Sequence, residues 1–212
     1  MPSELPYRSP FAPQLQPDGT YVAKTNEGVP FAYADVIEDP DPIIDWQAEL
    51  GLPHDLEELA VLARPRGLSS RRLRAVCGDE SVTRRSAGRP LRPQEWLYRF
   101  SGTPFSMEHL GLIIGVCYRM ENFPNDPVVR SIMMDLPEAA GNFLVVEVQL
   151  YDSMLAEAAW LGIQRRRFTH VCPVLLRPLD APPDSGELVE VCLTHRPVCP
   201  GARILKHWTE GS

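Results

Sequence analysis

Three residues of this chain, His109, Cys172 and Glu190, have side chains that together can attack and release an acyl group. A thiolate is a strong nucleophile, and an adjacent imidazole can take its proton and later protonate the leaving amine. A carboxylate can fix the tautomer of that imidazole and stabilise its protonated form. These residue types together indicate nucleophilic catalysis, in which cysteine is the nucleophile, histidine the base and glutamate the orienting group.

Each of these residues lies in or beside a segment whose pattern predicts a β-strand. His109 precedes the apolar run LGLIIGV, and Cys172 lies in the sequence FTHVCPV. Glu190 begins the sequence EVCLTHRPVCPGARI, which ends at Ile204. The histidine precedes the cysteine by 63 residues, and the glutamate follows it by 18.

In these three segments the chain resembles the prohead maturation proteases of tailed phages, which share a fold with the herpesvirus assembly proteases. Residues 190–204 match the family pattern E-V-S-L-x-x-x-P-A-x-P-x-A-x-I except at Cys192 and Val198. The segment from His109 resembles H-x-x-x-x-(I/V)-G-x-V, which carries the family's catalytic histidine. Cys172 stands where the family has its nucleophilic serine, and the following Pro173-Val174 departs from the family's glycine. The resemblance covers about 96–206, half of the chain.

The resemblance implies peptide hydrolysis of scaffold or major capsid precursor chains, including self-cleavage, with His109, Cys172 and Glu190 as the catalytic residues. It implies a homo-oligomer in the virion or the host cytoplasm, and no cofactor or metal. One of the arginines at 165–167 would stabilise the oxyanion. The alternative is a catalytically inactive relative that acts as a structural or scaffolding component of a capsid-like assembly. In that case Cys172 is a small buried hydrophobic residue, which is the commonest role of cysteine.

The composition of the 212 residues is that of an ordinary globular protein, with 44% hydrophobic and 23% charged residues. No apolar stretch approaches the roughly 18 residues that a membrane helix needs, so we expect no membrane partner. Nothing at the N-terminus has the pattern of a secretory leader. The five cysteines are an odd number without a CxxC pair, which predicts reduced thiols.

Charge is unevenly distributed along the chain, whose net charge is −7. Residues 1–63 hold 2 basic and 12 acidic side chains, whereas residues 64–99 hold 10 arginines and 3 acidic side chains. The arginines of 64–92 could bind nucleic acid. Pairing with the acidic N-terminal block, or plain solvation, is the favoured interpretation, because few aromatic residues interleave the arginines.

The pattern of elements predicts an α+β fold, with a mainly antiparallel β-barrel or sheet core and flanking helices. Residues 1–95 are expected to form a proline-rich N-terminal arm and an arginine-rich loop region, the loop over 64–93, and residues 96–212 the prohead-protease-like domain. Helices are expected over 55–63, capped by Asp55, and over 153–161, capped by Asp152 and stopped by Gly162. Strands are expected over 31–37, 110–118, 142–151, 167–176, 187–194 and 202–205.

Other residues with reactive side chains have simpler interpretations. Cys192, His195, Cys199 and His207 have a spacing that a zinc site could use, but Cys192 and His195 point to opposite faces of a strand. We therefore expect no metal. His170 lies on the same strand face as Cys172 and is an alternative base, but a solvent-facing strand histidine is the favoured interpretation. Ser153 is expected to be an ordinary hydroxyl at a helix start.

Overall fold

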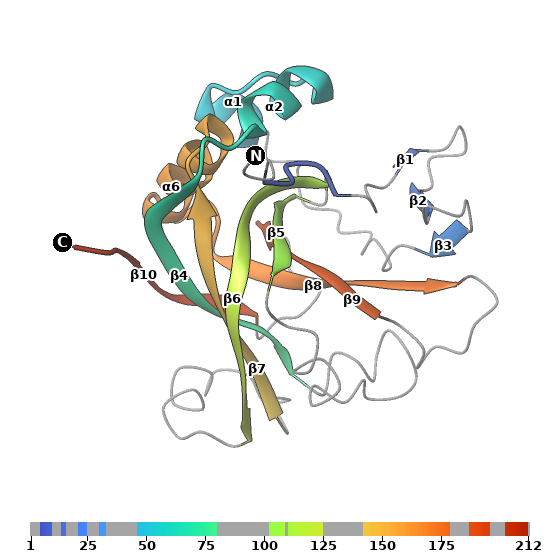
Figure 1. Ribbon diagram of the computed structural model, residues 1–212, viewed down its shortest axis with the longest axis vertical. Helices are drawn as coiled ribbons and strands as arrows, with labels where there is room; N and C mark the ends of the chain where they lie inside the picture. The colour runs from blue at the N-terminus through green and yellow to red at the C-terminus, as the bar shows by residue number, and fades with distance from the viewer. Residues whose placement is uncertain are drawn as a thin grey trace.

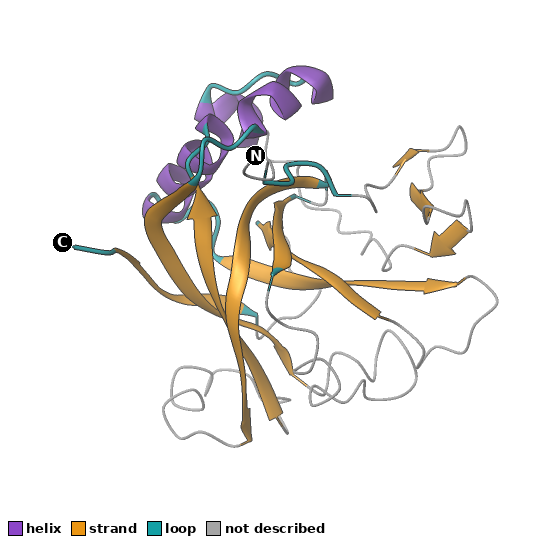
Figure 2. Cartoon of the chain, in the orientation of Figure 1, coloured by secondary structure: helices purple, strands orange, loops and turns teal. Residues whose placement is uncertain are grey.

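The fold is described from a computed structural model, which describes residues 5–9, 14–15, 21–24, 30–32, 46–79, 102–108, 110–124, 142–178, 187–195 and 202–211. Within these ranges three helices lie together at one end of a curled sheet (Figures 1 and 2). The helices are α1 (Trp46–Leu50), α2 (Leu56–Ala63) and α6 (Met154–Gln164).

Seven strands form the main sheet, in the order β8-β9-β5-β6-β7-β4-β10. Every neighbouring pair is antiparallel except β5 and β9, which run parallel. The sheet curls into a half-barrel (Figure 1), and the backbone N–H of Ile204 donates to the carbonyl of Thr169, 2.8 Å away, where the two ends of the sheet approach each other. The strands are β4 (Leu68–Asp79), β5 (Thr103–Met107), β6 (Leu112–Pro124), β7 (Asn142–Tyr151), β8 (His170–Pro178), β9 (Glu187–Thr194) and β10 (Arg203–Thr209).

The N-terminal region adds to this sheet at two places. Strands β1 (Gln14–Leu15), β2 (Tyr21–Lys24) and β3 (Pro30–Ala32) continue the sheet in antiparallel order from β8. Residues 5–9 lie against the start of β6, where the carbonyl of Tyr7 accepts from the N–H of Ile113 at 3.0 Å. The rest of the expected proline-rich arm lies outside the described residues.

The predicted α+β fold with a mainly antiparallel sheet core and flanking helices is confirmed. Strand β9 spans the predicted 187–194, and β7 the predicted 142–151. Both segments place apolar side chains at every second position, the pattern that a sheet with one face against a core requires.

The expectation of a loop over 64–93 was wrong for Leu68–Asp79, which form β4 between β7 and β10. The reason is that buried apolar residues alternate with partly exposed residues in this segment, a strand pattern that its many arginines obscure. Leu73, Ala75 and Cys77 are buried, whereas Arg72 and Arg74 are partly exposed and pair with acidic residues. Residues on both sides of the expected boundary at 95 therefore belong to one sheet.

Helix α2 begins as predicted, with Asp55 accepting from the backbone N–H of Glu57 and Glu58. The predicted cap of the second helix was wrong: Ser153 caps α6 by accepting from Ala156, and Asp152 pairs with Arg66 instead. Gly162 does not end the helix but lies inside it.

The helices cover the sheet through one continuous core. Leu155, Ala159 and Ile163 recur every four residues along α6 and are all buried, as expected of a helix face turned to a core. Gly162 allows α6 to pack directly against Phe168, since a Cβ atom at position 162 would lie 2.5 Å from the ring of Phe168. Larger members of this core include Leu59, Leu73, Phe105, Ile114, Leu150 and Trp160. Among the described residues no helix is long and apolar enough to cross a membrane.

Strands β6 and β7 approach too closely at Gly115 for any side chain. A Cβ atom at this position would lie 2.6 Å from the backbone oxygen of Gln149. We expect Gly115→Ala to lower the free energy of unfolding by about 1–3 kcal/mol, because backbone atoms must shift to admit the methyl group. Gly67→Ala is the control, since nothing lies within 4 Å of its Cβ position. Urea denaturation of both variants tests this, and equal midpoints would contradict it.

Candidate functional site

The register of β8 and β9 places two of the three predicted catalytic residues on one face of the sheet. Cys172 lies opposite Cys192, and Val174 lies opposite Glu190. Opposite residues of an antiparallel pair extend to the same face, so Cys172 and Glu190 are diagonal neighbours, about 7–8 Å apart. The other face of this hairpin, with Val171, Val191 and Leu193, packs into the main core.

A third strand contributes a hydroxyl to this face. Ser106 of β5 is the parallel register partner of Cys192. Its Oγ donates to Glu190 Oε1 at 2.9 Å, and both side chains are buried. A hydrogen bond to a buried carboxyl group fixes its orientation, because no water competes for it. Cys172, Glu190 and Ser106 therefore come from three consecutive strands and meet on one buried face.

The predicted base, His109, lies outside the described residues, but the backbone on either side of it is described. Glu108 donates its N–H to the carbonyl of Leu193 at 2.8 Å, and Leu110 donates to Met107 at 3.1 Å. Glu108, the residue before His109 in the chain, is therefore attached to the end of β9, the strand that also holds Glu190 and Cys192. Glu108 has a positive φ of 50°, uncommon for a residue with a side chain and typical of tight turns.

A carboxylate and an imidazole, not predicted as a pair from the sequence, also meet at this end of β9. Glu108 Oε1 accepts from the backbone N–H of His195 at 2.7 Å, and its Oε2 lies 2.9 Å from His195 Nδ1. The second contact has ion-pair distance without the alignment of a hydrogen bond. Both side chains are largely buried, so this contact is shielded from solvent just beyond the end of β9.

Burial limits access to the predicted nucleophile. Cys172 has no exposed surface and packs with Val174, Cys192 and Val189 in a small apolar cluster separate from the main core. The thiol of Cys192 donates to the carbonyl of Leu193 at 3.3 Å. Cys172 is therefore not accessible to a peptide in this conformation.

The alternative base, His170, is half-buried at the start of β8. Its Nδ1 lies 2.8 Å from the hydroxyl of Thr169. Burial, and secondarily the positive charge of Arg203, lower the pKa of His170. The ring is thus held more strongly in its neutral form, which is the form that accepts a proton.

The arginines at 165–167 follow α6 and are exposed. Arg165 caps the helix, Arg166 has a positive φ of 59°, and Arg167 Nε pairs with Glu49 at 3.0 Å. No described contact joins them to Cys172. Their predicted role at an oxyanion stays a prediction.

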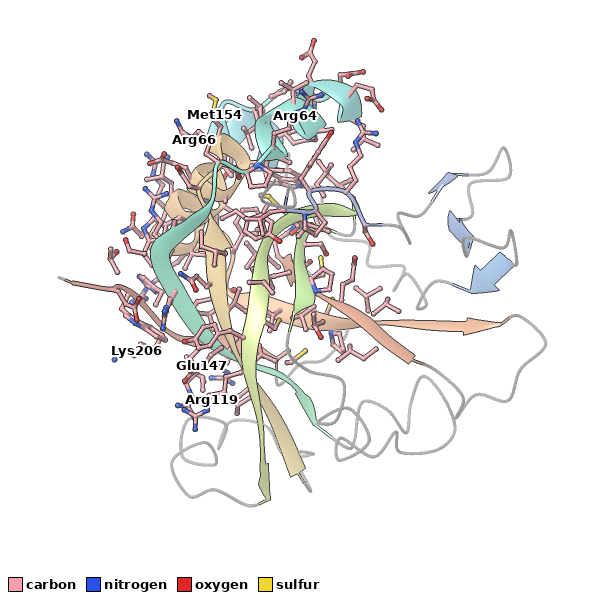
Figure 3. The ribbon with its side chains drawn as sticks, viewed as in Figure 1. Arg64, Arg66, Arg119, Glu147, Met154 and Lys206 are labelled. Carbon is pink, nitrogen blue, oxygen red and sulfur yellow. The ribbon has the colours of Figure 1, made fainter. Side chains whose placement is uncertain are left out.

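The described part of the arginine-rich stretch is engaged by the chain itself. Arg66, Arg71, Arg72 and Arg74 pair with acidic residues at 2.8–3.2 Å. Arg64 lies 5.7 Å from the ring of Tyr7. Figure 3 places Glu147, the partner of Arg74, beside Arg119 on the outside of the sheet. The arginines from Arg66 to Arg74 thus pair within the chain, but the expected partner block was wrong: their acidic partners lie at 147–210 and not in residues 1–63. The arginines from Arg84 to Arg92 lie outside the described residues.

The residues of the considered zinc site do not converge in the described part of the chain. His207 packs edge-on against Trp160, with ring centroids 5.3 Å apart, and Cys192 is buried on the face of β9 that also holds Glu190. Cys199 lies outside the described residues. No group of three or more histidine, cysteine, aspartate or glutamate residues among those described could hold a metal ion.

The chain was compared with protein families, curated proteins and solved structures. No family model, curated protein or solved structure matches it. The arrangement of the site therefore has to be interpreted from its own geometry.

Two features of this site were not predicted from the sequence: the serine Ser106 and the contact of Glu108 with His195. Ser106 gives no sequence signal, because its partner is 84 residues away and is reached only through the parallel pairing of β5 and β9. Glu108 does have a signal, since it adjoins the histidine that was singled out.

We expect Ser106→Ala to lower the free energy of unfolding by about 1–3 kcal/mol, because it leaves the carboxyl of Glu190 without this donor in a buried site. Ser70→Ala, at an exposed position of β4, should change stability by less than about 0.5 kcal/mol. Chemical denaturation measures both. Equal stability of the two variants would mean that this hydrogen bond contributes nothing.

The pKa of His170 predicts a pH dependence of stability. Because its folded pKa is lowered, the unfolded chain binds this proton more readily. Acidification from about pH 7.5 to about pH 5.5 should therefore favour unfolding through this residue. We expect His170→Gln to lose less stability than the unsubstituted protein over this interval, measured by urea midpoints at both pH values. Parallel losses would refute the assignment.

Proposed function

We propose that this chain is a divergent protein of the prohead maturation protease type, which hydrolyses peptide bonds of scaffold or capsid-precursor chains and of itself. The observation that carries the proposal is the meeting of Cys172 and Glu190 on one face of adjacent strands. In sequence these residues are 18 positions apart, and the pairing of β8 with β9 makes them neighbours. Glu108, which precedes His109 in the chain, is hydrogen-bonded to the same strand.

Each residue has a defined role in the proposed reaction. His109 takes the proton of the Cys172 thiol, and the thiolate attacks the carbonyl carbon of the peptide bond. The protonated imidazole then gives its proton to the leaving amine, which leaves an acyl-enzyme thioester. Water, deprotonated by His109, hydrolyses the thioester and regenerates the thiol. Glu190, oriented by Ser106, stabilises the protonated imidazole.

A second candidate is a non-catalytic relative that serves as a structural component of a capsid-like assembly. The complete burial of Cys172 beside Val174 and Cys192 favours it, because a buried thiol among apolar side chains stabilises a core without reacting. The two candidates differ in whether the face that holds Cys172 opens to a peptide.

Incubation of the purified full-length chain, alone and with a candidate scaffold chain, tests the proposal by intact mass. We expect discrete fragments from the unsubstituted protein and none from Cys172→Ala, since alanine has no nucleophile. His109→Ala should also abolish cleavage, and Glu190→Gln should slow it by roughly ten-fold or more.

Cys77→Ala is the matched control, because Cys77 is a buried cysteine of β4 and has no role in the proposed reaction. Cleavage by this variant at the unsubstituted rate supports the proposal. Intact chains in every sample would reject it in favour of the structural candidate. Fragments that persist in Cys172→Ala would point to a contaminating protease or to another nucleophile.

A further inference from the structure

Two cysteines meet across the strands β8 and β9. Cys172 and Cys192 are register partners within five consecutive, regular pairs, from His170–Thr194 to Val174–Glu190. Both are fully buried, and both belong to one cluster of packed side chains. Their side chains extend to the same face, because opposite residues of an antiparallel pair do so.

The backbone hydrogen bonds fix the kind of pair that these cysteines form. The carbonyl of Leu193 accepts from Glu108 on the β5 side of β9. Backbone polar groups of successive strand residues point to alternate sides, so those of Cys192 point to β8. Cys172 and Cys192 are therefore a hydrogen-bonded pair, whose Cα atoms lie about 5.5 Å apart. Disulfides most often join Cα atoms roughly 5.5–6 Å apart.

We propose that Cys172 and Cys192 are a redox pair, which a hydroperoxide converts into an intramolecular disulfide. The Cys172 thiolate attacks one peroxide oxygen, the O–O bond breaks, and Cys172 becomes a sulfenic acid while one water or alcohol leaves. The sulfur of Cys192 then attacks that of Cys172, the S–S bond forms, and a second water leaves. Two thiols are oxidised by two electrons, the peroxide is reduced by two, and a dithiol reverses the change.

The register makes this pair selective among the described cysteines. Cys117 of β6 lies opposite Thr103 and Val148, and both Cys117 and Cys77 pack in the main core, whereas Cys172 and Cys192 pack in a separate cluster. None of the four described cysteines is in a disulfide in this structure.

The consequence for activity rests on the proposed function. If Cys172 is the nucleophile, the disulfide switches hydrolysis off reversibly. Cys192 then protects the nucleophile, since a sulfenic acid that meets a thiol is withdrawn from further oxidation to the irreversible sulfinic acid. The formation of the bond itself does not depend on peptidase activity.

The test treats the full-length chain with hydrogen peroxide, removes the oxidant, denatures the protein, labels its thiols with iodoacetamide and measures intact mass. Of the five cysteines, all five should be labelled before oxidation and three after it. Digestion without reductant should yield a Cys172–Cys192 linked peptide, and prior treatment with dithiothreitol should restore five labels.

Two variants make the result specific. Cys77→Ser keeps the pair and should still lose two labels, whereas Cys192→Ser should give no intramolecular disulfide at Cys172, with circular dichroism confirming that each variant is folded. Five labels on the peroxide-treated unsubstituted protein, or a linked peptide that joins Cys172 to another cysteine, would overturn the proposal. The linked peptide of the unsubstituted protein decides the matter if a variant fails to fold. A chain that forms the disulfide but never cleaves a substrate would retain the redox pair and lose only the proposed peptidase.

Discussion

The position of β9 between β8 and β5 is the constraint on which the candidate site depends. Antiparallel pairing with β8 sets Cys172 against Cys192, and parallel pairing with β5 brings Ser106 to Glu190. A shift of one residue in either register would turn these side chains to the opposite face of the sheet. The apolar face of the same strands, with Val191 and Leu193 in the main core, opposes such a shift.

The two faces of this hairpin have different chemistry. One is apolar and joins the core beneath the helices, and the other combines two thiols with a buried carboxyl and its serine donor. Burying a polar group costs free energy unless the group is hydrogen-bonded. The buried carboxyl on this face therefore needs hydrogen-bond partners. Ser106 is one such partner, and the contact of Glu108 with His195 closes the end of the same strand.

The outside of the sheet follows a different rule. Along β4 buried residues alternate with arginines, and each described arginine of this strand reaches an acidic residue from another element. Glu147 of β7 illustrates how the charges interlock, since it accepts from Arg74 and from the hydroxyl of Tyr118. Each exposed ion pair of this kind contributes little stability. Together they explain why β4 has so many arginines, without the need for a polyanionic partner in this part of the chain.

The class of fold and several of its elements follow from the amino-acid sequence alone. Alternation predicted β7 and β9 within their observed bounds, and a side-chain cap predicted the start of α2, because these signals are local. The sequence also identified Cys172 and Glu190 as candidates, but not that they are neighbours. The contact of Ser106 with Glu190 and the facing of Cys172 by Cys192 were visible only in the folded chain. The physical reason is that pairing register joins residues that are 18 to 84 positions apart in the chain, and no local pattern carries that information.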